Sequence, residues 1–228
     1  GEEGLMARKL GWKGKIAVLS SWEPQDLAEL AKLRIGVVVH SFTTLSQVQQ
    51  MAKRGVRPIV HLKLDTGTTR IGFLPSDLKK LQLVLRGVKL ESVFSHLANA
   101  EDKTTKRTID QQKRFETMSE PWESSMRHLA CSAAIIRYPQ THFDLVRPGL
   151  MFYGYWPTVE LNHWAKHHRP GVTLTPVMSW YVRIASVKRI PVGTSVGYGS
   201  TWTAKKPTTI AVHRARELLP EPDRREHP

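Results

Sequence analysis

Short apolar runs rich in β-branched residues alternate with amphipathic helical patterns along the first part of the chain. The apolar run 16–19 is followed by a helical pattern over 24–33, and the run 35–39 is followed by one over 44–54. Strands separated by helices lie parallel in one sheet that is covered by those helices, and they are buried on both faces. The first 54 residues therefore predict two consecutive strand–helix units.

The alternation continues for about another hundred residues. Strands are predicted over 59–64, 92–95, 128–130 and 143–146, and helices over 75–85 and 105–118. An eight-stranded parallel barrel needs about 250 residues. The six predicted strands therefore indicate an α/β fold, an incomplete (β/α)8 TIM-type barrel that lacks two strand–helix units. An open dinucleotide-binding sheet is less favoured, because no glycine-rich fingerprint follows any strand.

The sequence pattern changes after residue 170. Short strands with turn signals are predicted over 176–184, 186–190 and 196–202. We therefore expect residues 1–170 to form the partial barrel and residues 171–212 to start an all-β domain. Residues 213–228 are rich in Arg, Glu, Pro and Asp, cannot bury enough apolar surface to become ordered, and are expected to be disordered.

Composition and charge bear on the class of protein. The net charge is +14, but the 34 Lys and Arg residues are spread along the chain, which argues against nucleic-acid binding. No apolar run approaches the roughly 20 residues of a membrane-spanning helix, so no membrane partner is expected. The single cysteine, Cys131, fits a reducing compartment, and we expect a cytoplasmic protein without a metal site. The absence of an initiator methionine suggests a piece of a longer chain.

The segment from His61 to Phe73 has the residue types of a functional strand end. It runs from a strand through a tight turn at Gly67 to Arg70, which brings a guanidinium to the mouth of a barrel. Asp65 is expected to cap the turn through its side chain. This segment resembles the corresponding one of the alanine racemase family in its order of residues, which is Lys63, then Asp-Thr-Gly, then Arg70 before Ile-Gly.

Four further segments resemble this family in the same order along the chain. They are 94–102 with His96, 128–134 with Ser132, 144–154 with Arg147, and 193–201 with Tyr198. Cys131 stands where the family has Asn, and Thr68-Thr69 stand where it has Met-Gly. The resemblance covers roughly residues 1–212. It implies a barrel that binds pyridoxal 5′-phosphate (PLP), a β domain, and a head-to-tail homodimer.

The resemblance also implies roles for individual residues. Arg147 donates a hydrogen bond to the pyridine nitrogen of PLP, which leaves that nitrogen unprotonated because a guanidinium keeps its protons. Tyr198 moves the α-proton on one face of alanine, reaching into the other subunit's site. His96 and Arg147 form a relay to Tyr198, and Arg70 lies near the phenolic oxygen of PLP and the substrate carboxylate.

The phosphate of PLP is expected to bind at a cup formed by the hydroxyl of Ser132 and the backbone N–H groups of Gly149 and Leu150. Lys63 resembles a lysine that some family members carry as a carbamate, where it orients the arginine that matches Arg70. The family's Schiff-base lysine lies in a Lys-Ala-x-Ala-Tyr-Gly-His-Gly segment, and none of the 228 residues resembles it. We therefore expect a fragment, truncated at both ends, that is inactive by itself.

Residues 208–212 resemble the family up to a point where His213 begins an unrelated stretch, and a reading-frame shift near residue 212 is the alternative to a genuine tail. The parent activity implied is the interconversion of L- and D-alanine, with D-alanine serving the peptidoglycan of a bacterial cell wall. A serine or broad-specificity racemase, an amino-acid decarboxylase of the same barrel group, and a non-catalytic PLP-binding barrel remain alternatives.

Overall fold

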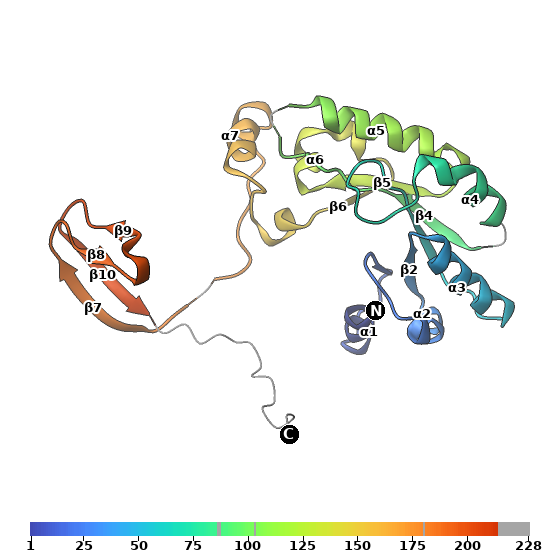
Figure 1. Cartoon of the computed structure of the whole chain (residues 1–228), viewed down its shortest axis with the longest axis horizontal. Helices are drawn as coiled ribbons and strands as arrows, with labels where there is room; N and C mark the ends of the chain where they lie inside the picture. The colour runs from blue at the N-terminus through green and yellow to red at the C-terminus, as the bar shows by residue number, and fades with distance from the viewer. Residues whose placement is uncertain (86–87, 103, 180, 214–228) are drawn as a thin grey trace, which may run out of the picture. The chain divides into compact units, whose positions relative to one another are not determined.

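The computed structural model describes residues 1–85, 88–102, 104–179 and 181–213 (Figure 1). The chain divides into two compact units, Gly1–Val177 and Met178–Pro228. No helix among the described residues is both long enough and apolar enough to span a bilayer.

The first unit is built on one six-stranded parallel sheet whose strands follow one another in chain order. The strands are β1 (Ile16–Val18), β2 (Ile35–Val39), β3 (Val60–Lys63), β4 (Leu90–Phe94), β5 (Met126–Cys131) and β6 (Leu145–Arg147). The sheet curls into a half-barrel (Figure 1). The predicted incomplete barrel is thus confirmed, and the carboxyl ends of all six strands lie along one rim.

Seven α-helices accompany these strands in the described part of the first unit. They are α1 (Glu2–Lys9), α2 (Leu27–Lys32), α3 (Phe42–Lys53), α4 (Leu78–Val84), α5 (Lys106–Ser119), α6 (Ser132–Arg137) and α7 (Val159–His168). The four predicted helices correspond to α2, α3, α4 and α5, whereas α1, α6 and α7 were not predicted. Helix α3 begins earlier than predicted, because Ser41 caps it: its hydroxyl accepts from the Thr44 N–H at 3.2 Å.

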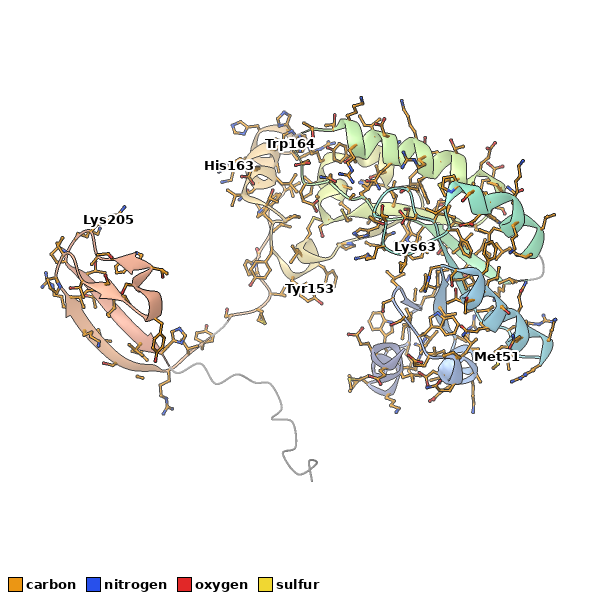
Figure 2. The ribbon with its side chains drawn as sticks, in the orientation of Figure 1. Met51, Lys63, Tyr153, His163, Trp164 and Lys205 are labelled. Atoms are coloured by element: carbon orange, nitrogen blue, oxygen red, sulfur yellow. The ribbon has the colours of Figure 1, made fainter. Side chains whose placement is uncertain are left out.

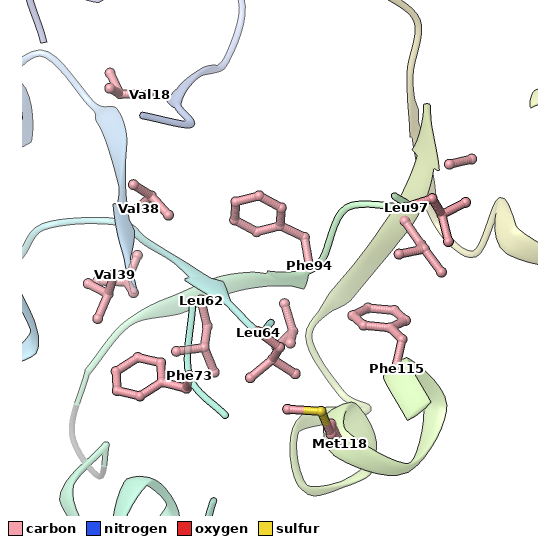
Figure 3. Packing of buried hydrophobic residues seen from close by; sticks show 14 of the residues in the cluster. Val18, Val38, Val39, Leu62, Leu64, Phe73, Phe94, Leu97, Phe115 and Met118 are labelled. Atoms are coloured by element: carbon pink, nitrogen blue, oxygen red, sulfur yellow. The ribbon is translucent and has the colours of Figure 1, made fainter. Parts of the chain in front are cut away.

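The strands β3, β4 and β5 alternate between an apolar and a polar face. Their apolar residues join the main hydrophobic core, which includes Leu62, Leu64, Phe73 and, from α5, Phe115 and Met118 (Figure 3). The other face carries four buried polar side chains, together with the ring of Phe94: His61, Lys63, Ser92 and His128. Both faces of these three strands are therefore buried, as predicted, although one of the two buried faces is partly polar.

The second unit contains two small antiparallel sheets. Strand β7 (Ile184–Ile190) pairs with β10 (Thr208–His213), and β8 (Ser195–Val196) pairs with β9 (Trp202–Thr203). The predicted strand over 176–184 is wrong, because none of its described residues before Ile184 is in a strand. The predicted strand over 196–202 is interrupted by a 3-10 turn, η6 (Tyr198–Ser200), where Gly197 and Gly199 have φ values of 75° and 74°.

The predicted disordered tail starts one residue too early, because His213 is the last residue of β10 and pairs with Ile184. The rest of that prediction, residues 214–228, lies outside the described residues.

Candidate functional site

The loop after β3 is organised by one carboxylate. Oδ1 of Asp65 accepts hydrogen bonds from the N–H groups of Gly67, Thr68 and Thr69 at 2.8, 3.0 and 3.2 Å, and Oδ2 accepts from the N–H of Arg70 at 3.2 Å. At Gly72 (φ 130°) a Cβ atom would lie 2.7 Å from the backbone nitrogen of Asp65, so the loop can close there only on a glycine. The loop thus holds the backbone of Arg70 at the rim of the sheet, where its side chain is exposed.

Arg147 ends β6 and is held by acceptors from neighbouring strands. Its Nη1 bonds to Nδ1 of His128, and its Nη2 donates to the backbone carbonyl oxygens of Ser95 at 2.6 Å and Leu129 at 3.2 Å. Burial lowers the pKa of Arg147 to about 10, which still leaves the guanidinium charged at neutral pH. The side chain is therefore a fixed, partly desolvated cation.

Lys63 and His96 share the electrostatic environment of Arg147. Lys63, labelled in Figure 2, is 3% exposed, and its Nζ lies 4.7 Å from the ring centroid of Phe94. Burial, followed by the charges of Arg147 and Arg70, lowers the pKa of Lys63 to about 8. Burial, followed by the charges of Arg147, Lys63 and Arg70, lowers the pKa of His96 to about 4, so this imidazole is neutral at pH 7. The structure thus brings these four predicted residues together.

A second group forms around Ser132, the first residue of α6. Its hydroxyl accepts hydrogen bonds from the N–H of Gly149 at 2.8 Å and of Met151 at 3.4 Å. A Cβ atom at Gly149 would meet Ser132 Oγ at 3.7 Å and no other neighbour within 4 Å, so the space above this glycine is open. Ser132 and Gly149 are adjacent, as predicted, and Leu150 follows them in the same turn with an exposed side chain.

Tyr198 belongs to the second unit, where it opens the 3-10 turn η6 and its side chain is fully exposed. Within that unit it has none of the other predicted site residues beside it. Its pairing with His96 therefore remains a prediction.

The basic cluster of Lys63, Arg70 and Arg147 is suited to an anionic ligand. Within the described ranges, none of the three forms an ion pair with a carboxylate, and Asp65 is the acid whose charge acts on Lys63. Buried cations without a counter-ion are costly, and an anion or a hydrogen-bond acceptor relieves that cost. Thr68 Oγ1, also buried, has no hydrogen-bond partner. Over the same part of the chain no group of three or more His, Cys, Asp or Glu residues could hold a metal ion.

Two residues that hold this site were not predicted as site residues. His128 accepts from Arg147, and Ser92 bonds to His128. The sequence carries only a weak signal for them: Ser92 and His128 each place a polar side chain in an otherwise apolar strand, but the pairing of the strands decides which side chains meet.

Comparison with known families matches almost the whole described chain. The family described as alanine racemase, N-terminal domain, matches residues 1–157, and the alanine racemase C-terminal domain matches residues 177–215.

Individual relatives agree with the family matches. The alanine racemase of Desulforamulus reducens is 35% identical over 214 residues, which are 90% of this chain and 56% of the relative. The structure of the biosynthetic alanine racemase from Pseudomonas aeruginosa aligns with a TM-score of 0.76 at 30% identity, over 92% of this chain and 57% of that one. The Bartonella henselae alanine racemase, a structure with covalently bound pyridoxal phosphate, shares the fold at a TM-score of 0.73 and 24% identity, over 93% of this chain and 58% of that one.

The chain thus spans a little over half the length of the relatives that it matches. Its parallel half-barrel, its rim of cations and both family matches lead to one assignment. The chain belongs to the alanine racemase family.

Proposed function

We propose that this chain supplies the cofactor-binding part of a PLP-dependent racemase that interconverts L- and D-alanine. The observation that carries the proposal is the proximity of Lys63, Arg70, His96 and Arg147 at one rim, where no carboxylate of the described residues forms an ion pair with the three cations. Membership of the family supports it, as does the bound pyridoxal phosphate of the Bartonella henselae relative. Alanine is favoured over serine as the substrate, because the similar proteins are named alanine racemases.

The chain's donors fit the groups that PLP presents. Arg147 has N–H groups to give to the pyridine nitrogen, and Ser132 with the backbone at Gly149 and Leu150 would hold the phosphate. When bound, PLP withdraws electrons from the α-carbon of an amino acid and makes its proton acidic. Because Arg147 stays protonated, it would donate to the pyridine nitrogen and leave that nitrogen unprotonated, which would weaken this withdrawal and favour simple return of the proton.

Arg70 would bind the substrate carboxylate, and Tyr198 would hold or move the α-proton. A free tyrosine has a pKa of about 10, so Tyr198 needs a neighbour that stabilises its anion. His96, neutral at pH 7, can accept one hydrogen bond and donate another, which suits it to link Tyr198 to Arg147. Tyr198 would come from the second subunit of a head-to-tail homodimer.

Lys63 is suited to carry a carbamate. With a pKa of about 8, roughly one molecule in ten has a neutral amine at pH 7. The nitrogen lone pair attacks the carbon of CO2, an N–C bond forms, and the nitrogen releases a proton. The resulting anion would compensate the charges of Arg70 and Arg147.

The 228 residues alone are proposed to be inactive, because they contain no segment like the one that holds the family's cofactor lysine. We further propose that the activity serves D-alanine supply for peptidoglycan in the cytoplasm.

Calorimetric titration with 4-deoxypyridoxine 5′-phosphate tests the proposal. This PLP analogue lacks the aldehyde and therefore cannot react with surface lysines. We expect saturable binding at one site per chain. Arg147→Lys should weaken binding about tenfold or more, since it removes the planar set of donors. The matched change Arg107→Lys, at an exposed position of α5, should leave affinity unchanged. Absence of saturable binding, or equal effects of both changes, would refute the proposed function.

A further inference from the structure

A line of hydrogen bonds crosses the inner face of the half-barrel from Arg147 to the opposite end of the strands. Arg147 Nη1 bonds to His128 Nδ1, His128 Nε2 lies 2.9 Å from Ser92 Oγ, and Ser92 Oγ lies 2.6 Å from His61 Nδ1. Ser92 is 1% exposed, His128 2% and His61 8%. These residues come from four neighbouring strands, β3 to β6, and they exclude water from most of the line.

The chemistry of Arg147 fixes the direction of the two hydrogen bonds that His128 makes. A guanidinium has donors and no acceptor, so His128 Nδ1 must accept and carries no proton. Neutral His128 then has its proton on Nε2 and donates it to Ser92 Oγ. Among the described residues, His61 Nδ1 is the remaining partner of the Ser92 hydroxyl, so we assign the hydroxyl hydrogen to this bond, in which His61 Nδ1 accepts. His61 therefore also has its proton on Nε2.

Both histidines are neutral at pH 7, as this assignment requires. Burial, followed by the charge of Arg147, lowers the pKa of His128 to about 2. Burial is also the largest cause for His61, whose pKa falls to about 4.

Two neighbours fix the positions of the imidazole rings. His128 stacks on Phe94, with ring centroids 4.8 Å apart and planes 5° apart. Gly36 on β2 leaves the space that His61 occupies, since a Cβ atom there would lie 2.2 Å from His61 Nε2. Beyond this point His61 lines a cavity of about 550 Å³, together with Lys15 and Glu91. The proton on His61 Nε2 is thus at the end of the line.

We propose that Ser92 is a positioning residue: its hydroxyl joins His61 to His128, holds His128 in the Nε2–H form, and so keeps a bare Nδ1 aimed at Arg147. Stacking on Phe94 sets the plane of the imidazole but does not choose between its two flipped orientations; Ser92 at Nε2, together with Arg147 at Nδ1, does. The expected effect on ligand binding rests on the proposed function of Arg147. The tautomers of His61 and His128 do not depend on that function.

Two-bond ¹H–¹⁵N spectra of the chain labelled with ¹⁵N-histidine test the inference without any ligand. His128→Gln and His61→Gln identify the two signals. In the unmodified chain at pH 7, both residues should show a protonated Nε2 and a bare Nδ1. A proton on Nδ1 of His128, or a charged His128 ring, would overturn the inference, whatever the variants do.

Ser92→Ala should make the His61 signal a mixture of tautomers, and Ser92→Thr, which keeps a hydroxyl, should restore one tautomer. Ser76→Ala, at an exposed position, is the matched control. Affinity for 4-deoxypyridoxine 5′-phosphate should fall about fivefold in Ser92→Ala, the equivalent of one neutral hydrogen bond, and recover in Ser92→Thr. Unchanged tautomers in Ser92→Ala would overturn the role of Ser92. The expected tautomers in a chain that binds no analogue would instead refute the proposed function and leave the relay standing.

Discussion

Replacing Asp65 tests how the Arg70 loop is held. Asp65→Ala removes an ionised acceptor of four backbone N–H groups. Hydrogen bonds to a charged group each contribute about 1.5–3 kcal/mol, but water can reach the exposed backbone of Thr69 and Arg70 and replace part of that. We therefore expect the free energy of unfolding to fall by about 3 kcal/mol, which is less than the sum of four such bonds.

Asp65→Asn is the more informative variant. Its remaining carbonyl oxygen can still accept from Gly67, Thr68 and Thr69, but its NH2 group faces the Arg70 N–H, and two donors repel. The free energy of unfolding should fall by about 1–2 kcal/mol. The turn should remain, but the backbone of Arg70 should no longer be held by a hydrogen bond. The affinity for 4-deoxypyridoxine 5′-phosphate should then fall by more than the unfolded fraction of the Asp65→Asn variant accounts for.

Urea unfolding followed by far-ultraviolet circular dichroism measures both losses. Asp110→Asn, on the exposed face of α5, is the matched control and should stay within about 0.5 kcal/mol of the parent chain. Equal stabilities of Asp65→Asn and the parent chain would refute the reasoning, as would an Asp65→Asn variant as unstable as Asp65→Ala.

Three further predictions concern the inner face of the half-barrel. Gly36→Ala should lower the free energy of unfolding by about 1–3 kcal/mol, because its Cβ would overlap His61; urea unfolding that matches the parent chain would contradict this. His61 and His128 have folded-state pKa values of about 4 and 2, below 6.5, so the unfolded chain takes up their protons first. Each should cost about 1.4 kcal/mol of stability per pH unit as pH falls below 6.5, and His128→Gln should flatten the measured slope. Lys63 should give a carbamate carbon signal in ¹³C spectra recorded with ¹³C-bicarbonate, and the signal should be absent in Lys63→Gln.

Much of the first unit could be predicted from the sequence, because each of the first five strands was separated from the next by a helical pattern. The order of β1 to β5 followed from that alternation, and the turn at Asp65 followed from its residue types. Helix α6 was missed, since its six residues continue directly from β5 without a turn signal between them.

Other features depended on contacts that a linear pattern does not display. The run 176–184 has the residues of a strand, but β7 starts where it ends, because the partner strand β10 supplies its register from Ile184 onward. His128 and Ser92 read as ordinary interruptions of apolar strands. Their function of holding Arg147 depends on registers across β4, β5 and β6, which no single segment encodes.

A crystal structure of the chain with 4-deoxypyridoxine 5′-phosphate tests the central claim most directly, namely that the carboxyl ends of β3 to β6 form one cofactor site. We predict the pyridine nitrogen within hydrogen-bond distance of the Arg147 guanidinium and the phosphate against Ser132 and Gly149. A ligand bound elsewhere, with Arg147 still bonded to His128 and making no contact with the ring, would contradict the account.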